Sequence, residues 1–326
     1  MYVNWPQKVL DKYEKWQNKN TVNLSKKEKN IVVSLDGSGD FTSIQEAINN
    51  TKAFPYEEIT IFIKNGKYNE KINIHQWNSN LSLVGENREK TIISFDDYFD
   101  KMKKGRNSTF YTYTLQIQGD DVKIKNLTIE NTSGEVGQAV ALSVTSNRVI
   151  IANCTILGNQ DTLYASGTGK QFYTNCYIEG TTDFIFGSAT AVFDSCRIHS
   201  KKNSYITAAS TPEKAQYGFV FKDCNLTSNQ NITKVYLGRP WRIYAKTVFI
   251  NCKLGNHILP EGWHNWSKPE AEKTSFYAEY NNNGVEANEK SRVKWSHQLS
   301  KKQSKKYTLK NILYDDSTNP FWYEKI

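Results

Sequence analysis

The sequence predicts an all-β protein folded as a right-handed, single-stranded parallel β-helix. The first observation is a repeated unit in which a small polar residue precedes Cys or Leu and an aliphatic residue follows two positions later. The unit occurs as KNLTI from Lys125, NCTI from Asn153, NCYI from Asn175, SCRI from Ser195, DCNL from Asp223 and NCKL from Asn251. Its cysteines, at positions 154, 176, 196, 224 and 252, are 22, 20, 28 and 28 residues apart. This period suits the coils of a solenoid, which bury their apolar faces by stacking on one another.

The second observation is the kind of segment that fills the chain from Ile59 onward. Short stretches rich in β-branched residues are separated by turn residues, and no helical interval is long enough for a βαβ unit. These stretches are EITIFIKNG, KINI, NLSLVGE, KTIISF, YTLQIQG and VKIKNLTIEN. A β-sandwich with chance similarity among its strands is the alternative fold.

The remaining segments complete the prediction in chain order. We expect residues 1–29 to form an N-terminal helix and linker extension, and residues 30–326 to form the β-helix domain. A short capping helix follows the strand IVVSL, because Thr42 and Ser43 precede Gln and Glu by three residues, as in a capping box. The segment at residues 296–313 has helical or irregular character, and we expect it to pack against the coil stack or to cover its end.

The composition excludes several classes of protein and partner. The 326 residues include 42 Lys+Arg and 33 Asp+Glu, a net charge of +9, which is compatible with an acidic polymer as partner. A solvated basic surface gives the same total. No apolar run approaches the roughly 20 residues that span a bilayer, and no basic stretch has the aromatic pattern of a nucleic-acid motif. We therefore expect no membrane and no nucleic acid as partners, and we expect a monomer.

The five cysteines do not indicate a disulfide framework or a zinc site, because their number is odd and no CxxC pair is present. On a β-helix they would stack in the interior as small apolar groups. Neighbouring rungs lie roughly 4.8 Å apart, so distance alone does not exclude a bridge. Stacked free thiols are the prediction.

Polar residues inside otherwise apolar segments are the candidates for chemistry. The motifs of serine hydrolases, zinc proteases and nucleotide-binding proteins are absent. What remains is Gln138 in QAVAL, Gln160 and Asp161 in NQDTLY, and Asp183 in DFIFG. From Gln138 to Asp161 is 23 residues and from Asp161 to Asp183 is 22, close to one coil. The spacing therefore predicts that these three side chains form a column on one face.

Two carboxylates in such a column would lie within roughly 5–6 Å of each other, given the spacing of adjacent strands. Like charges at about 5 Å interact by roughly 3 kcal/mol at an effective dielectric constant near 20, which is on the order of 2 pKa units. One carboxyl group would then hold a proton near neutral pH, which divides the pair into an acid and a base or nucleophile. The alternative is a pair of turn aspartates bonded to the backbone.

A cation and a set of aromatic residues complete the candidate site. Arg239 in LGRPW can donate hydrogen bonds to both oxygens of a carboxylate and so fix its orientation. Aromatic side chains near these segments could form a stacking cleft for sugar rings, although each alone is more often a core residue. They are Phe110, Tyr164, Phe186, Trp241 and Trp263.

Five segments, in order, resemble the signature segments of pectin methylesterases. They are GKYNE (66–70), QAVAL (138–142), QDTLY (160–164), DFIFG (183–187) and LGRPW (237–241). The resemblance extends from residue 30 to about residue 270. It implies a parallel β-helix enzyme that hydrolyses the methyl esters of polygalacturonate (methyl-esterified homogalacturonan) to pectate and methanol, without a metal or organic cofactor.

The resemblance also implies a role for each matching residue. Asp183 would be the nucleophile, and Asp161 the general acid that protonates methanol and then the base that activates water. Gln138 and Gln160 would donate hydrogen bonds to the oxyanion, and Arg239 would orient Asp183. Thr109 and Trp241 match positions that contact substrate; Tyr164, Phe186 and Trp263 fit positions that line the cleft. Tyr68 and Glu70 have a structural part.

Two other functions remain open. One is a hydrolase or lyase on the same fold that cuts the polygalacturonate chain, since paired aspartates also serve glycoside hydrolysis. The other is a non-catalytic solenoid that binds acidic polysaccharide. An acidic polymeric substrate implies secretion, or a periplasmic or cell-surface location, although the start of the chain shows no signal peptide.

Overall fold

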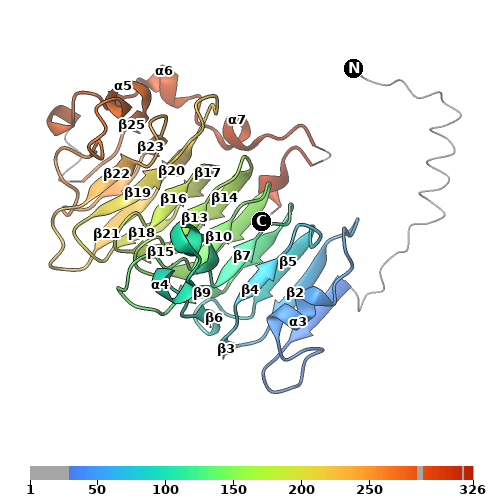
Figure 1. Cartoon of the computed structure of the whole chain (residues 1–326). Coiled ribbons are helices and arrows are strands. Elements are labelled where there is room, and N and C mark those ends of the chain that lie inside the picture. Colours follow the sequence, from blue (N-terminus) through green and yellow to red (C-terminus); the bar gives the residue numbers. More distant parts are fainter. Residues whose placement is uncertain (1–28, 285–288, 318, 326) are drawn as a thin grey trace, which may run out of the picture.

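The computed structural model describes residues 29–284, 289–317 and 319–325, and it is a right-handed parallel β-helix (Figure 1). In each complete coil the chain passes through one strand of each of three sheets, and every coil stacks on the previous one. All strand pairs are parallel, as predicted. The expected N-terminal helix and linker lie outside the described residues, apart from residue 29.

Three parallel sheets form the sides of the helix. Sheet A contains β1 (Asn30–Val33), β2 (Ile59–Ile63), β5 (Leu81–Gly85), β8 (Lys123–Lys125), β11 (Val149–Ala152), β14 (Lys170–Thr174), β17 (Thr190–Asp194), β20 (Phe219–Lys222), β23 (Lys246–Ile250), β25 (Phe276–Tyr280) and β26 (His297–Gln298). Sheet B contains β3 (Gly66–Tyr68), β6 (Thr91–Phe95), β9 (Thr128–Asn131), β12 (Thr155–Leu157), β15 (Tyr177–Gly180), β18 (Arg197–Ser200), β21 (Asn225–Ser228) and β24 (Lys253–Leu254). Sheet C contains β4 (Ile72–Ile74), β7 (Leu115–Ile117), β10 (Leu142–Val144), β13 (Leu163–Ala165), β16 (Ile185–Gly187), β19 (Tyr205–Ala209) and β22 (Tyr236–Pro240).

Helical segments are short and lie at the ends of the coils or between them. They are α3 (Ile44–Asn49), α4 (Phe99–Met102), η1 (Gly105–Tyr111), α5 (Ala271–Thr274), η2 (Glu289–Ser291), α6 (Lys301–Ser304), α7 (Leu309–Leu313) and η3 (Trp322–Glu324). None of the helices in the described part of the chain is long and apolar enough to cross a bilayer.

The repeated unit found in the sequence marks the sharp turn from sheet A into sheet B. Its small polar residue has a left-handed φ between +51° and +58° in every copy from Asn126 to Asn251. Asn and Asp adopt this conformation more readily than most other residues. The side chains also bond between coils: Asn153 Nδ2 donates to Asn126 Oδ1 (2.8 Å) and Asn175 Nδ2 to Asn153 Oδ1 (3.1 Å). The repeat is therefore a repeated backbone turn.

Identical positions of successive coils stack in the interior. The rings of Tyr173, Phe193, Phe221 and Phe249 form a continuous stack, with centroids 4.7, 4.5 and 4.4 Å apart. The five cysteines are buried and free, as predicted. Stacking lets each coil bury the apolar face of its neighbour, which a single coil cannot do alone.

The capping helix α3 packs on the N-terminal coils (Figure 1) and buries Ile44 and Ile48. Ser43 accepts a hydrogen bond from Glu46 N, so the predicted N-cap is present. The carboxylate of Glu70, in the GKYNE segment, also accepts from Ser43 Oγ and from the backbone of Ile44. Glu70 therefore has the structural part expected for it.

The C-terminal segment packs against the side of the coil stack. Ile312 and Leu313 of α7, with Trp322, join an apolar cluster on the outer face of sheet A that includes Phe172 and Val192. Strand β26 extends sheet A beyond β25. Of the two expected placements, packing against the stack is the one observed.

Candidate active site

Asp161 and Asp183 lie in consecutive coils, at the turn from sheet B into sheet C. Asp161 stands two residues before β13 and Asp183 two residues before β16, and these strands pair with Leu163 opposite Ile185. Both aspartates have left-handed φ angles, +64° for Asp161 and +49° for Asp183. Aspartate tolerates this conformation, so the chain can turn sharply here. Both residues line the same hollow.

Gln138 is offset by one position from the predicted column. The backbone pairs Gln138 with Gln160, and not with Asp161. Four residues lead from Gln138 to Leu142, but three lead from Gln160 to Leu163, and Leu142 and Leu163 are again opposite each other. The extra residue is accommodated as a local bulge, a feature that spacing alone does not reveal. Both glutamines still line the hollow.

The hollow has a volume of about 530 Å³ and contains most of the residues proposed from the sequence. It is lined by Arg106, Thr109, Phe110, Gln138, Gln160, Asp161, Asp183, Phe186, Ala208, Arg239, Trp241, Arg242 and Trp266. Tyr164 is not among these residues, but its ring packs beside two of them, 5.1 Å from that of Phe110 and 4.8 Å from that of Phe186. Tyr164 therefore supports the aromatic wall.

The prediction that Trp263 lines the cleft is wrong. Its side chain is 1% exposed and belongs to the core, where the indole stacks on Tyr277 with centroids 4.3 Å apart. The backbone of Trp263 forms an isolated β-bridge with Gly238, and the Trp263 side chain points into the interior of the coil. Trp266, which the sequence analysis did not select, lines the hollow. The chain turns between the two tryptophans, where Trp266 has a left-handed φ of +55°, so strand alternation could not have distinguished them.

Arg239 holds Asp183 through two hydrogen bonds. Nε donates to Oδ1 (2.9 Å) and Nη2 to Oδ2 (2.7 Å). The guanidinium lies between two rings, with Cζ 3.6 Å from the Trp266 centroid and 4.0 Å from the Tyr205 centroid. Lys268 Nζ donates to the carbonyl oxygen of residue 240 (2.8 Å), so the end of β22 is also fixed. The bidentate bond and the stacking together fix the orientation of the Asp183 carboxylate.

The two aspartates have different electrostatic environments. Burial raises the pKa of Asp161 well above its usual range, and the charge of Asp183 raises it further. Burial also raises the pKa of Asp183, but the hydrogen bonds and the charge of Arg239 oppose that increase. Since the guanidinium bonds to Asp183 alone, a proton shared by the pair resides on Asp161. The two carboxyl groups therefore differ in their tendency to hold a proton, and that tendency is greater for Asp161.

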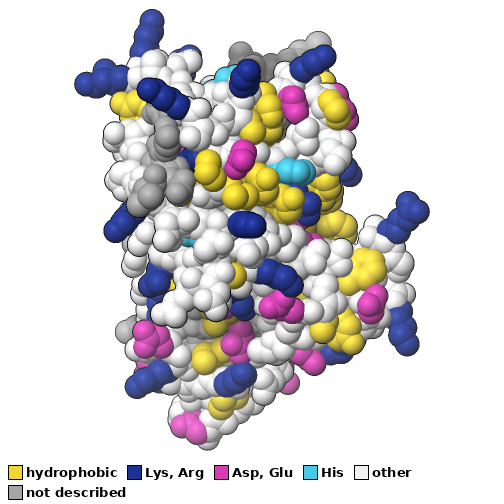
Figure 2. Space-filling view, turned by 90° about the vertical axis from the view of Figure 1, so that its left-hand side faces the viewer, with side chains coloured by type: hydrophobic (Ala, Val, Ile, Leu, Met, Phe, Trp, Pro, Cys, Tyr) yellow, Lys and Arg dark blue, Asp and Glu magenta, His cyan; other side chains and the backbone are white. Residues whose placement is uncertain are grey.

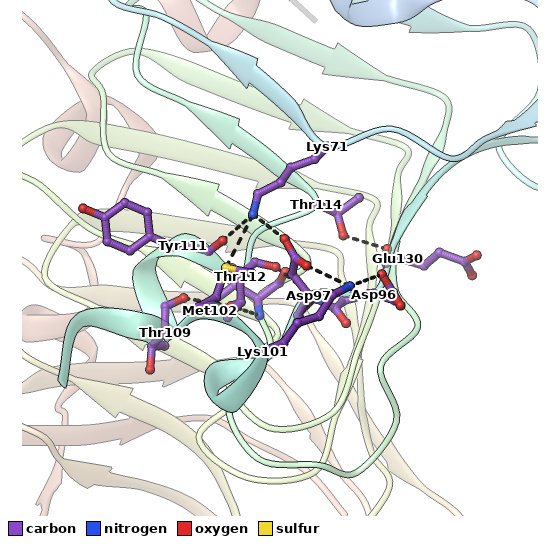
Figure 3. Close-up of polar contacts among 12 residues, drawn as sticks. Lys71, Asp96, Asp97, Lys101, Met102, Thr109, Tyr111, Thr112, Thr114 and Glu130 are labelled. Atoms are coloured by element: carbon purple, nitrogen blue, oxygen red, sulfur yellow. Dashed lines mark hydrogen bonds and ion pairs between the residues drawn. The ribbon is translucent and has the colours of Figure 1, made fainter. Parts of the chain in front are cut away.

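One wall of the hollow comes from the insertion between β6 and β7, and an ion-pair cluster around the buried Asp97 anchors it (Figure 3). Lys71 Nζ lies 2.5 Å from Asp97 Oδ2, and Lys101 Nζ lies 3.0 Å from Asp97 Oδ1. Lys71 also lies over the ring of Tyr113, 4.8 Å from its centroid. Asp97 is buried, so the two ammonium groups compensate its charge. Thr109 of η1 lies on the wall that this cluster holds.

Hydrogen bonds tie the same wall to the segment that carries Gln138. Asn131 Nδ2 donates to the backbone oxygens of Asp97 (2.8 Å) and Val140 (3.1 Å). Thr112 Oγ1 accepts from Val140 N (2.9 Å) and donates to the backbone oxygen of Thr109 (2.8 Å). The positions of Thr109 and of the QAVAL segment are therefore coupled.

Basic side chains surround the hollow. Arg106 and Arg242 line it in addition to Arg239. In Figure 2, Lys and Arg side chains are spread over the face shown, Asp and Glu side chains lie among them, and hydrophobic side chains gather in its upper half. Among residues 29–284, 289–317 and 319–325, no three His, Cys, Asp or Glu side chains converge as a metal site.

The pectinesterase family model matches residues 30–316. The chain belongs to the pectinesterase family. It is 38% identical over 306 residues to a probable pectinesterase/pectinesterase inhibitor 13 of Arabidopsis thaliana, covering 88% of this chain and 48% of that protein. The chain thus spans about half the length of this relative.

Solved pectin methylesterases share the fold. The enzyme from carrot has a TM-score of 0.83 and 31% identity, covering 89% of this chain and 95% of the carrot chain. A pectin methylesterase in complex with a hexasaccharide has a TM-score of 0.77 and 30% identity, covering 88% of this chain and 97% of that one. The resemblance found in the five sequence segments is therefore confirmed at the level of the family.

Proposed function

We propose that the protein hydrolyses the methyl esters of polygalacturonate, releasing methanol and leaving free carboxylates. The observation that carries the proposal is the pair of buried aspartates in consecutive coils. One has a strongly raised pKa, and the other is bound by Arg239. Two amide side chains line the same hollow. This set supplies an acid, a nucleophile and oxyanion donors in one place.

In the first step, the ionised Asp183 carboxylate attacks the ester carbonyl carbon. Gln138 and Gln160 donate hydrogen bonds to the oxyanion that develops, and such donors are typically worth about 10²-fold or more in rate. The C–O bond to the methoxy group then breaks, and the departing oxygen takes the proton of Asp161. Methanol leaves, and an anhydride joins Asp183 to the sugar carbonyl.

In the second step, Asp161 is a carboxylate and acts as a general base. It takes a proton from water while the water oxygen attacks the sugar carbonyl of the anhydride. The bond to Asp183 breaks, which restores its carboxylate and releases the galacturonate acid group. Asp161 ends protonated, so the cycle returns to its starting state. In both steps, Arg239 keeps the Asp183 carboxylate in the same orientation.

The hollow also suits the proposed polymer. Phe186, Trp241 and Trp266 provide flat apolar surfaces for sugar rings, and Arg106 and Arg242 provide positive charge for neighbouring free carboxylates. A hexasaccharide is present in the complex of the solved relative. Because the polymer lies outside cells, we expect the protein to be secreted or held at the cell surface.

A methanol-release assay on methyl-esterified polygalacturonate tests the proposal. We expect methanol from the wild-type protein, none from Asp183→Ala, and wild-type release from the control Asp316→Ala, which removes an exposed aspartate. A hydrolase that cuts the chain would instead produce new reducing ends, and a lyase would produce unsaturated ends. A binding solenoid would release no methanol in any variant. Wild-type activity in Asp183→Ala would rule out the assigned nucleophile.

A further inference from the structure

A second hollow lies where sheet C turns into sheet A in the N-terminal coils. Its volume is about 510 Å³, close to the 530 Å³ of the candidate active site. Uncharged polar side chains, among them Gln76, Gln118 and Thr145, form much of its lining. A smaller hollow of about 180 Å³ shares Asp121 and Arg148 with it. We call the two together the corner groove.

Three exposed aromatic side chains occur at this corner. Phe54, which lines the larger hollow, is 66% exposed, Tyr56, which lines the smaller one, is 77% exposed, and Trp77 is 48% exposed. The backbone N–H of Phe54 donates to the carbonyl oxygen of Trp77 (2.7 Å), so the two segments are joined. The Trp77 ring stacks on His75, with centroids 4.4 Å apart and an angle of 18° between the planes. The Trp77 ring is therefore held by a neighbour while much of it remains in water.

The backbone of Phe54 is strained, which makes its exposed ring more informative. Its φ is +49°, in the left-handed region that bulky side chains rarely adopt. Core packing does not explain a phenylalanine here, because most of its side chain is in water. Strained positions of this kind tend to occur at functional sites. The chain thus presents a flat apolar surface at the edge of a polar hollow.

The charges of the larger hollow differ from those of the candidate active site. The smaller hollow also has Lys123, which pairs with Glu58, and Lys325 in its lining. Arg148 is the cation among the described residues that line the larger hollow. Its guanidinium bonds to both oxygens of Asp121 (2.7 and 2.6 Å), and it also lies 3.7 Å from Asp120 and 3.5 Å from Asp315. Three carboxylates therefore surround one positive charge. A polyanion would meet repulsion in the larger hollow, whereas an uncharged sugar would not.

We propose that the corner groove is a second carbohydrate site, which binds methyl-esterified stretches of the galacturonate polymer in preference to de-esterified ones. Sugar rings stack on Phe54 and Trp77, and their hydroxyl groups bond to the amide and hydroxyl side chains of the lining. The choice of this polymer rests on the proposed function. The groove retains unreacted substrate and loses affinity for a stretch once its carboxylates are free.

The test measures binding of highly methyl-esterified and fully de-esterified polygalacturonate to the Asp183→Ala protein, in which turnover is blocked. Phe54→Gly removes the ring and relieves the backbone strain, since glycine accepts a positive φ. We expect this variant to stay folded and to bind the esterified polymer about tenfold more weakly, in line with the loss of an aromatic contact. Trp77→Ala is the second variant, and Leu35→Ala, which shortens an exposed side chain elsewhere, is the control.

A variant that removes one negative charge gives a second test, because a purely structural role of the groove would not change the preference between the two polymers. Asp120→Asn, in the same background, should increase binding of the de-esterified polymer and leave binding of the esterified one nearly unchanged. Unaltered affinity for the esterified polymer in both aromatic variants, or an equal loss in Leu35→Ala, would overturn the proposal. If the wild-type protein releases no methanol, the proposed function fails, while these binding results still decide whether the groove is a carbohydrate site.

Discussion

Replacing Arg239 with methionine keeps a long side chain but removes the two hydrogen bonds that hold Asp183. The bonds measure 2.9 and 2.7 Å, and both side chains are mostly buried. Removing one partner of such a pair typically costs about 3–5 kcal/mol, because the other charge is left buried and unpaired. That is a cost in stability. For activity, loss of a group that organises charge at the reacting centre typically costs about 10²–10³-fold, so we expect kcat/KM to fall by about that factor at neutral pH.

The pH dependence of the same variant gives an independent check. Arg239 lowers the pKa of Asp183, so its removal raises that pKa. The increase of activity that follows ionisation of Asp183 should then occur at higher pH. The assay is the pH profile of methanol release for the wild type, Arg239→Met and Arg239→Lys; lysine keeps the charge without the bidentate geometry and should fall in between. A wild-type profile and a kcat/KM within a few-fold of wild type in Arg239→Met would refute the reasoning.

Three further predictions concern stability, the wall of the site and the thiols. Because the folded pKa of Asp161 is raised, its contribution to stability is complete below the unfolded pKa of about 3.9 and is lost as the pH rises toward the folded value. In urea unfolding, Asp161→Asn should therefore be more stable than the wild type at pH 7 and no more stable than the wild type near pH 3. The same difference in unfolding free energy between variant and wild type at both pH values would contradict this. Lys71→Met should lower the free energy of unfolding by about 2–3 kcal/mol, because Lys101 is then the only ammonium group among the described residues that pairs with Asp97. The same variant should raise KM more than it lowers kcat. An unchanged KM would show that the cluster has no effect on substrate binding. The five cysteines should react with a thiol reagent only after denaturation, since all are buried, and fast labelling of the native protein would contradict the stacked interior.

The parts of the fold that the sequence predicts are those specified locally and then repeated. The turn before each cysteine needs a residue that tolerates a positive φ, and Asn, Asp or Ser supplies it in every coil. Stacking then places equivalent residues above one another, so a spacing of 22 residues was sufficient to bring Asp161 next to Asp183. The predicted three-residue column was nevertheless offset at Gln138, because one extra residue before β10 changes the register and has no signature in the spacing.

The parts that the sequence did not predict depend on contacts between distant segments. Trp266 covers Arg239 because the loop after Trp263 folds back over β22, and neither tryptophan carries a local signal for which one is exposed. Lys71 and Asp97 are 26 residues apart, and the insertion between β6 and β7 brings them together. Such pairings follow from the path of a loop, which composition and periodicity do not determine.

Infrared spectroscopy of the buried carboxyl groups tests the central claim most directly, because it reports which aspartate holds the proton in the resting protein. At neutral pH the wild type should show the carbonyl band of a protonated carboxylic acid. That band should disappear in Asp161→Asn and remain in Asp183→Asn, since burial is the main cause of the raised pKa of Asp161. Loss of the band in Asp183→Asn with its survival in Asp161→Asn would contradict the assignment of acid and nucleophile.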